Sequence, residues 1–129
     1  MLEEKSLCTF CDAHFHLVQC SRFFDVHNIY PSSENESFFG CTCSHEREEY
    51  FLHKEQSAVL SEKFKNVHLF TSFGIHPQLP LTENAVFLED LLRCGEIDAV
   101  GEAGFDLYTP EFKKTILEQE GAWRTQVEL

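Results

Sequence analysis

Short apolar segments alternate with longer amphipathic ones along this chain of 129 residues. The short segments have the length and composition of strands, over residues 7–13, 38–42, 67–74 and 97–100. The longer segments repeat their apolar positions with helical spacing, over residues 46–65, 84–94 and 110–129. Residues 20–37 are polar and rich in turn-forming side chains, which predicts a long loop. Four strands that alternate with helical segments predict an α/β fold with a parallel sheet, either an open doubly wound sheet or part of a TIM (β/α)8 barrel.

Two helix ends are marked by residues with defined capping roles. Gly95 follows the 84–94 segment and is typical of the residue that stops a helix. Thr109 precedes Pro110, a pair that is typical of an N-cap followed by the first helical residue. The last helix is therefore predicted to begin at Pro110 and to continue to the end of the chain.

Composition and charge limit the classes of protein to which this chain can belong. The length fits a single domain, residues 1–129, and the hydrophobic content of 43% is ample for a packed core. The net charge of −12 repels polyanions, so a nucleic acid would be bound only with the help of cations or a local basic patch. The N-terminus does not resemble a secretory signal, and no segment approaches the roughly 20 apolar residues of a membrane span. These features predict a cytoplasmic protein that does not cross a membrane.

Six cysteines leave two interpretations open. Cys8 and Cys11 form a CxxC pair, and Cys41 and Cys43 form a CxC pair that His45 follows closely. Thiolates and an imidazole at these positions could hold a tetrahedral zinc ion. The spacing matches no common zinc ribbon or finger, and the first pair runs into a predicted strand. Reduced, buried thiols are therefore the preferred interpretation.

Polar motifs follow three of the predicted strands at the point where each strand ends. His14 and His16 follow the first strand, His76 follows the third, and Glu102 and Asp106 follow the fourth. In both candidate folds the carboxyl ends of the strands converge on one face, where binding and catalytic residues gather. We therefore expect these five side chains to belong to one site.

The segment Asp12-Ala13-His14-Phe15-His16 places three polar residues two positions apart. Side chains on a strand alternate between its faces, so Asp12, His14 and His16 are expected to point the same way. Two imidazoles so arranged can share one divalent ion, and the nearby carboxylate can fix the tautomer of a ring. The alternative is that the histidines only line a polar rim. The aspartate and the other motifs favour metal ligation.

The acidic motif and His76 each allow more than one role. Glu102 lies between Gly101 and Gly104, which let the backbone pass close to a ligand, and its carboxylate can bridge two cations; the alternative is a turn or capping glutamate. Asp106 could support a ligand, act as a base for an attacking water, or be a turn aspartate. His76 could contact a substrate phosphate or have a structural role. The other histidines have no such context and are interpreted as surface or core residues: His27, His45, His53 and His68.

Taken in order, the motifs Asp-x-His-x-His, Gly-Ile-His-Pro and Gly-Glu-x-Gly-x-Asp resemble those of the TatD family of metal-dependent hydrolases. The last helix resembles the family pattern at Gln119, Trp123, Gln126 and Leu129. The resemblance covers almost the whole chain except residues 20–37, where the family has a helical segment. It implies a TIM barrel that carries two divalent ions, Mg, Mn or Zn, at its carboxyl face and hydrolyses the phosphodiesters of DNA.

The resemblance also implies roles for individual residues. By motif position, His14 and His16 would bind one metal ion, and Glu102 would bind it too and bridge to the second. Glu102 and Asp106 would be catalytic, and Asp12 and His76 would support the ligands or contact the substrate phosphate. Bound cations would also let an acidic protein hold the phosphates of its DNA substrate.

The length of the chain departs from the family pattern. A barrel of this type takes about 250 residues, and this chain supplies about half of them, or about four βα units. The sequence therefore predicts a truncated N-terminal half, which lacks the later ligands of the family. We expect the ions to be at most partly bound, and the chain alone could be inactive. The open edge of a half-barrel predicts self-association or pairing with another chain.

Two other functions are compatible with the sequence. An amidohydrolase barrel also has His-x-His after its first strand and would act on amide or amine bonds of small molecules. A non-catalytic half-barrel would instead bind a partner chain through its exposed edge. Gly-Ile-His-Pro and the glutamate motif favour the TatD-like hydrolase over the amidohydrolase.

Overall fold

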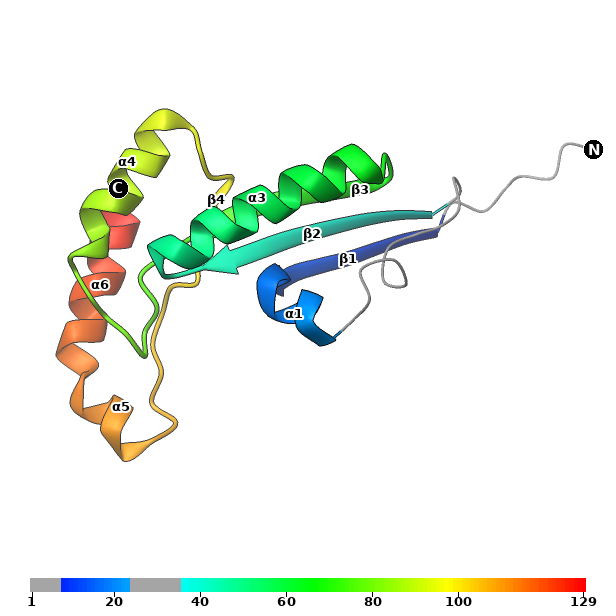
Figure 1. Ribbon diagram of the computed structural model, residues 1–129. Coiled ribbons are helices and arrows are strands. Elements are labelled where there is room, and N and C mark those ends of the chain that lie inside the picture. Colours follow the sequence, from blue (N-terminus) through cyan, green and yellow to red (C-terminus); the bar gives the residue numbers. More distant parts are fainter. Residues whose placement is uncertain (1–7, 24–35) are drawn as a thin grey trace, which may run out of the picture.

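The computed structural model describes residues 8–23 and 36–129 of the chain. Its centre is a four-stranded sheet in which all neighbouring strands are parallel: β1 (Cys8–Phe15), β2 (Glu36–Ser44), β3 (Val67–Phe73) and β4 (Ala99–Val100). The strands lie side by side in chain order, and the sheet curls as a half-barrel (Figure 1). A doubly wound sheet would reverse its strand order, so the order observed here is that of a partial TIM barrel. The predicted α/β fold is confirmed.

Helices follow the strands along the chain: α1 (Leu17–Phe23), α3 (Arg47–Lys63), α4 (Asn84–Cys94), α5 (Pro110–Lys114) and α6 (Ile116–Glu128). Helix α3 lies along β2 and β3, α1 contacts α3, and α6 contacts α4 (Figure 1). The loop predicted over residues 20–37 is wrong at both ends, because residues 20–23 complete α1 and β2 begins at Glu36. Its remainder, residues 24–35, lies outside the described residues. None of the helices in the described part of the chain is long and apolar enough to cross a lipid bilayer.

The core lies between the sheet and its covering helices. Two groups of buried apolar side chains form it: Leu17, Leu60 and Val67 in one, and Tyr50, Phe73, Leu88 and Leu91 in the other. Burying each of these side chains stabilises the fold by roughly 1.5–3 kcal/mol relative to leaving it exposed. The second group fixes β3 against α3 and α4, and so places the loop that follows β3.

The opposite face of the sheet carries aromatic side chains that remain in contact with solvent. Phe39 and Phe70 are exposed there, and the ring of Phe39 stacks on that of His68 at 4.6 Å between centroids. In a closed barrel this face would be the packed interior. Strands β1 and β4 are the outer strands of the described sheet. Pairing of this half-barrel with another chain stays a prediction.

The helix ends agree with their sequence signals except in one place. Gly95 adopts φ 65° and ψ 34° at the end of α4, and the Thr109 side chain accepts a hydrogen bond from Phe112 N–H at 3.3 Å. The single helix predicted after Pro110 is instead divided at Thr115 into α5 and α6. The Thr115 hydroxyl and the Gln119 amide both donate to the Phe112 carbonyl, at 2.9 and 2.8 Å. In a continuous helix the Phe112 carbonyl would accept a backbone N–H from the next turn, and these side chains donate to it instead.

Candidate metal centre

Strand β1 contains a bulge next to the two histidines of the first motif. The register pairs Asp12 with Gly40 and Phe15 with Thr42, so β1 contains one residue more than β2 across this step. The Asp12 carboxylate accepts a hydrogen bond from His14 N–H at 3.0 Å within this irregular part of the strand. The extra residue also resets the alternation of side chains. Asp12 is in register with the row of β2 that faces α3, and the strict alternation that placed it beside the histidines is wrong for this reason.

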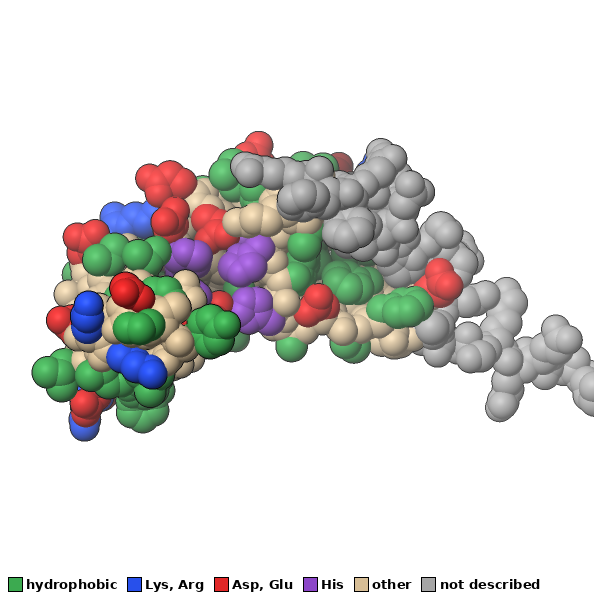
Figure 2. Space-filling model, turned by 90° about the horizontal axis from the view of Figure 1, so that it is seen from below, with side chains coloured by type: hydrophobic (Ala, Val, Ile, Leu, Met, Phe, Trp, Pro, Cys, Tyr) green, Lys and Arg blue, Asp and Glu red, His purple; other side chains and the backbone are tan. Residues whose placement is uncertain are grey.

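The structure brings His14, His16 and Glu102 together. One potential ligand atom from each lies within 4.8 Å of the others, and His14 Nε2 is 3.3 Å from Glu102 Oε2. Glu102 comes from the loop after β4, although β1 and β4 are the outer strands of the described sheet. Figure 2 shows histidine side chains gathered on one face of the molecule with acidic side chains beside them. Curvature of the sheet therefore assembles the three residues predicted as metal ligands.

Two imidazoles and one carboxylate form a donor set that suits a divalent transition-metal ion. Zinc and manganese take nitrogen and oxygen ligands of this kind, whereas magnesium prefers oxygen alone. Among the described side chains, these three are the one group whose geometry could hold an ion. A second ion that shares Glu102 stays a prediction.

His76 supports Glu102 from the other side. Gln78 N–H donates to His76 Nδ1 at 3.1 Å, so the ring proton belongs on Nε2, which lies 3.3 Å from Glu102 Oε2. Burial lowers the pKa of His76, and the nearby Glu102 carboxylate offsets only part of that effect. His76 is therefore a neutral imidazole whose Nε2 faces the carboxylate of Glu102.

Asp106 lies near His76 but outside the three-residue group. Its carboxylate accepts hydrogen bonds from Gln78 Nε2 at 2.7 Å and from Tyr108 N–H at 2.8 Å. These two bonds hold the pKa of Asp106 below its ordinary value, so the group is ionised at neutral pH. The structure thus joins Asp106 to the His76 loop through Gln78.

Two buried glutamines of α6 fix the loops that carry the site. Gln119 Oε1 accepts from Asp106 N–H at 2.7 Å, and Gln119 Nε2 donates to the carbonyl of the same residue at 3.0 Å. In the same way, Gln126 Oε1 accepts from Ile75 N–H at 2.7 Å, and Gln126 Nε2 donates to the Ile75 carbonyl at 3.2 Å. Each amide satisfies one donor and one acceptor of a loop that strand pairing does not reach. The glutamines of the last helix therefore position Asp106 and His76.

Three residues that the sequence did not indicate also lie at the site: His45, Glu49 and His53. Glu49 Oε1 lies 3.2 Å from His16 Nδ1, and its Oε2 lies 3.5 Å from His45 Nδ1. The fully buried His53 has Nε2 at 3.9 Å from Glu49 and Nδ1 at 2.8 Å from Thr42 Oγ1. His45 directly follows β2, so the rule that polar residues gather at strand ends could have found it. Its interpretation as a surface or core residue did not anticipate this contact with Glu49.

The described cysteines do not build the alternative zinc site. Cys11, Cys20, Cys41, Cys43 and Cys94 are free thiols. Cys11 is exposed, whereas Cys43 is buried on β2, where burial raises the pKa of its thiol. No cysteine joins a group that could hold a metal among the side chains that the structure describes.

Two histidines that are partly or fully shielded from water should make the fold less stable at mildly acidic pH. Burial lowers the pKa of His53 and of His76, and nearby carboxylates offset only part of the effect. Below about pH 6.5 the unfolded chain takes up protons that the folded chain excludes. The contribution of these histidines to the free energy of unfolding is therefore complete above this pH, and it is lost as the pH falls toward their lower pKa values in the folded state. We expect a lower urea midpoint at about pH 5.5 than at about pH 7.5.

The variant His53→Gln should show a smaller difference between the two midpoints. It should keep part of the difference, because His76 contributes in the same direction. A wild-type midpoint that rises on acidification would contradict the argument.

Parallel strands in barrel order and a His-His-Glu group at their carboxyl ends define a class of protein. They are the arrangement of metal-dependent hydrolases built on βα barrels. Residues 11–129 match the family model described as TatD related DNase, so the chain belongs to this family. No curated protein and no solved structure matches the chain. The family match confirms the resemblance read from the motifs and favours it over the amidohydrolase alternative.

Proposed function

We propose that this protein is a metal-dependent deoxyribonuclease that hydrolyses phosphodiester bonds of DNA. The observation that carries the proposal is the convergence of His14, His16 and Glu102 within 4.8 Å, in a chain that belongs to the TatD-related DNase family. Divalent ions held by these residues would supply positive charge to the phosphate and acidify an attacking water. The net charge of −12 repels a polyanionic substrate, and bound cations would offset this repulsion.

The side chains around the ligands have complementary tasks in this proposal. Glu102 would hold the ion together with the two histidines, and the neutral His76 lies beside its carboxylate, with Nε2 at 3.3 Å from Oε2. Asp106 is ionised and accepts a proton from the attacking water. Asp12 keeps the bulge of β1, and with it the direction of His14.

Metal removal and replacement test this function. Any cleavage of nicked or single-stranded DNA by the purified chain is expected to require added zinc or manganese and to be lost completely in a chelator. Magnesium should support less activity because two of the three proposed ligands are imidazoles. Release of acid-soluble nucleotides measures cleavage, and cyclic amides serve as control substrates. Turnover of the amides without cleavage of DNA would contradict the proposal, as would cleavage that resists the chelator.

A further inference from the structure

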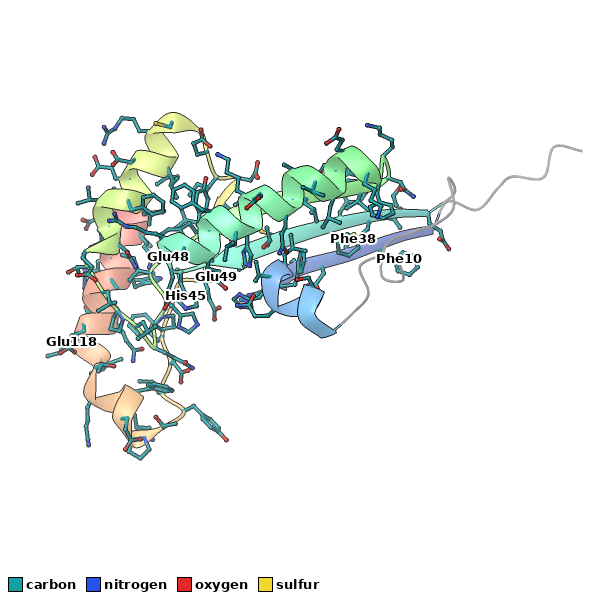
Figure 3. The ribbon with its side chains drawn as sticks, in the orientation of Figure 1. Phe10, Phe38, His45, Glu48, Glu49 and Glu118 are labelled. Carbon is teal, nitrogen blue, oxygen red and sulfur yellow. The ribbon has the colours of Figure 1, made fainter. Side chains whose placement is uncertain are left out.

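Glu49 is a nearly buried acid on which two histidines of the site converge. It lies in the first turn of α3, and its side chain is 10% exposed. Its Oε1 faces His16 Nδ1 at 3.2 Å, and its Oε2 faces His45 Nδ1 at 3.5 Å. Figure 3 shows Glu49 and His45 close together at the start of α3. The proposed function gives Glu49 no role.

The carboxylate of Glu49 is held from two sides. Gln19 of α1 donates its side-chain N–H to Oε1 at 2.8 Å, and the backbone N–H of His45 donates to Oε2 at 3.3 Å. The first turn of a helix is also a favourable place for a negative charge. Each oxygen therefore has a donor of its own besides the imidazole that it faces, and the carboxylate is fixed in orientation.

Both oxygens of Glu49 already act as acceptors, Oε1 for the side chain of Gln19 and Oε2 for the backbone N–H of His45. An ionised carboxylate can only accept hydrogen bonds. The nitrogen of His16 that contacts Glu49 must therefore be the one that carries the proton.

We propose that Glu49 is a positioning residue of the metal centre, which holds His16 with its proton on Nδ1 and so leaves the lone pair of Nε2 for the ion. The inference rests on the proposed function, because it assigns His16 to the ion that His14 and Glu102 share. Metal-binding histidines commonly donate their other ring N–H to a carboxylate, which fixes the ring and raises its basicity. Glu49 is placed for this task on His16, and its second oxygen orients His45 toward the same face.

Zinc affinity of matched variants tests the proposal. Glu49→Gln removes the charge with little change of shape, and Glu48→Gln makes the same change at the exposed neighbouring acid in the same helical turn. Calorimetric titration with zinc should show affinity about 10- to 100-fold weaker for Glu49→Gln than for the wild type. Glu48→Gln should bind zinc as the wild type does. Equal losses in the two variants, or no loss in Glu49→Gln, would overturn the proposal.

The tautomer of His16 gives a second readout that needs no metal and no folded variant at position 49. Nitrogen-15 NMR of the imidazole rings in the metal-free wild type, assigned with His16→Gln, should place the proton of His16 on Nδ1. A proton on Nε2 would overturn the proposal, even if zinc binds. A wild-type chain that binds no zinc but shows the Nδ1 proton would instead reject the metal centre and retain the contact between Glu49 and His16. The two failures are therefore distinguishable.

Discussion

Replacement of Glu102 by glutamine is expected to abolish metal-dependent cleavage of DNA and to weaken zinc binding by about 100-fold or more. Loss of a residue that supports a ligand typically costs 10- to 100-fold in affinity, so loss of a ligand should cost at least as much. Glu102 Oε2 lies 3.3 Å from both His14 Nε2 and His76 Nε2. It is the single carboxylate in the three-residue group, and glutamine keeps its size without its charge.

Zinc titration and a nicked-DNA assay measure the two effects of Glu102→Gln. Glu118→Gln is the matched control, because Glu118 is exposed on α6 and lies away from the start of α3, where His45 and Glu49 meet (Figure 3). The control should retain wild-type affinity and cleavage. Thermal unfolding of both variants should resemble that of the wild type, which separates loss of the site from loss of the fold. Cleavage by Glu102→Gln at the wild-type rate would remove Glu102 from the catalytic machinery.

Replacement of Gly74 by alanine is expected to lower the free energy of unfolding by about 1–3 kcal/mol, the usual cost of overpacking. An added Cβ would lie 2.6 Å from the carbonyl oxygen of Glu102 and 2.6 Å from the carbonyl carbon of Gly101. It would also lie 2.9 Å from Gln126 Oε1. Two of these three neighbours are backbone atoms, which cannot rotate away. The segment that carries Glu102 must therefore shift, and zinc affinity should fall together with stability.

Gly121→Ala is the matched control for Gly74→Ala. Gly121 lies inside α6, and an added Cβ there meets nothing within 4 Å. Alanine in a helix interior is more stable than glycine by roughly 0.5–1 kcal/mol, so this variant should gain stability. Urea denaturation of the two variants should therefore show shifts of opposite sign. A gain of stability in Gly74→Ala would contradict the close packing of β3 against the Glu102 segment.

Local signals carried most of what could be predicted about the fold. Helix α4 has the predicted bounds, Asn84–Cys94, because a helical repeat of leucines ends at a glycine that tolerates positive φ. Strand β3 also differs from its predicted bounds by only one residue. Residues 20–23 and Thr115 were predicted wrongly because distant contacts decide them. Leu17 in α1 packs with Leu60 and Val67, and Gln119 reaches back to the Phe112 carbonyl.

The candidate site could be predicted only in part, for a related reason. His14, His16, His76 and Glu102 were identified because each follows a strand in the sequence, and parallel strands bring their carboxyl ends to one face. Asp106 was identified by the same rule, but its partners Gln78 and Gln119 were not. Glu49 and His53 lie within a helix and carry no local signal for a site.

The sequence by itself determined the alternation of strands and helices, the family motifs and the residue types that can bind a divalent ion. These properties depend on local composition and spacing. Only the tertiary structure decided that a bulge separates Asp12 from the two histidines and that Glu49 meets His16 and His45. Bulges and contacts between helices depend on how sheet curvature and core packing set distant segments against each other, which no short stretch of sequence specifies.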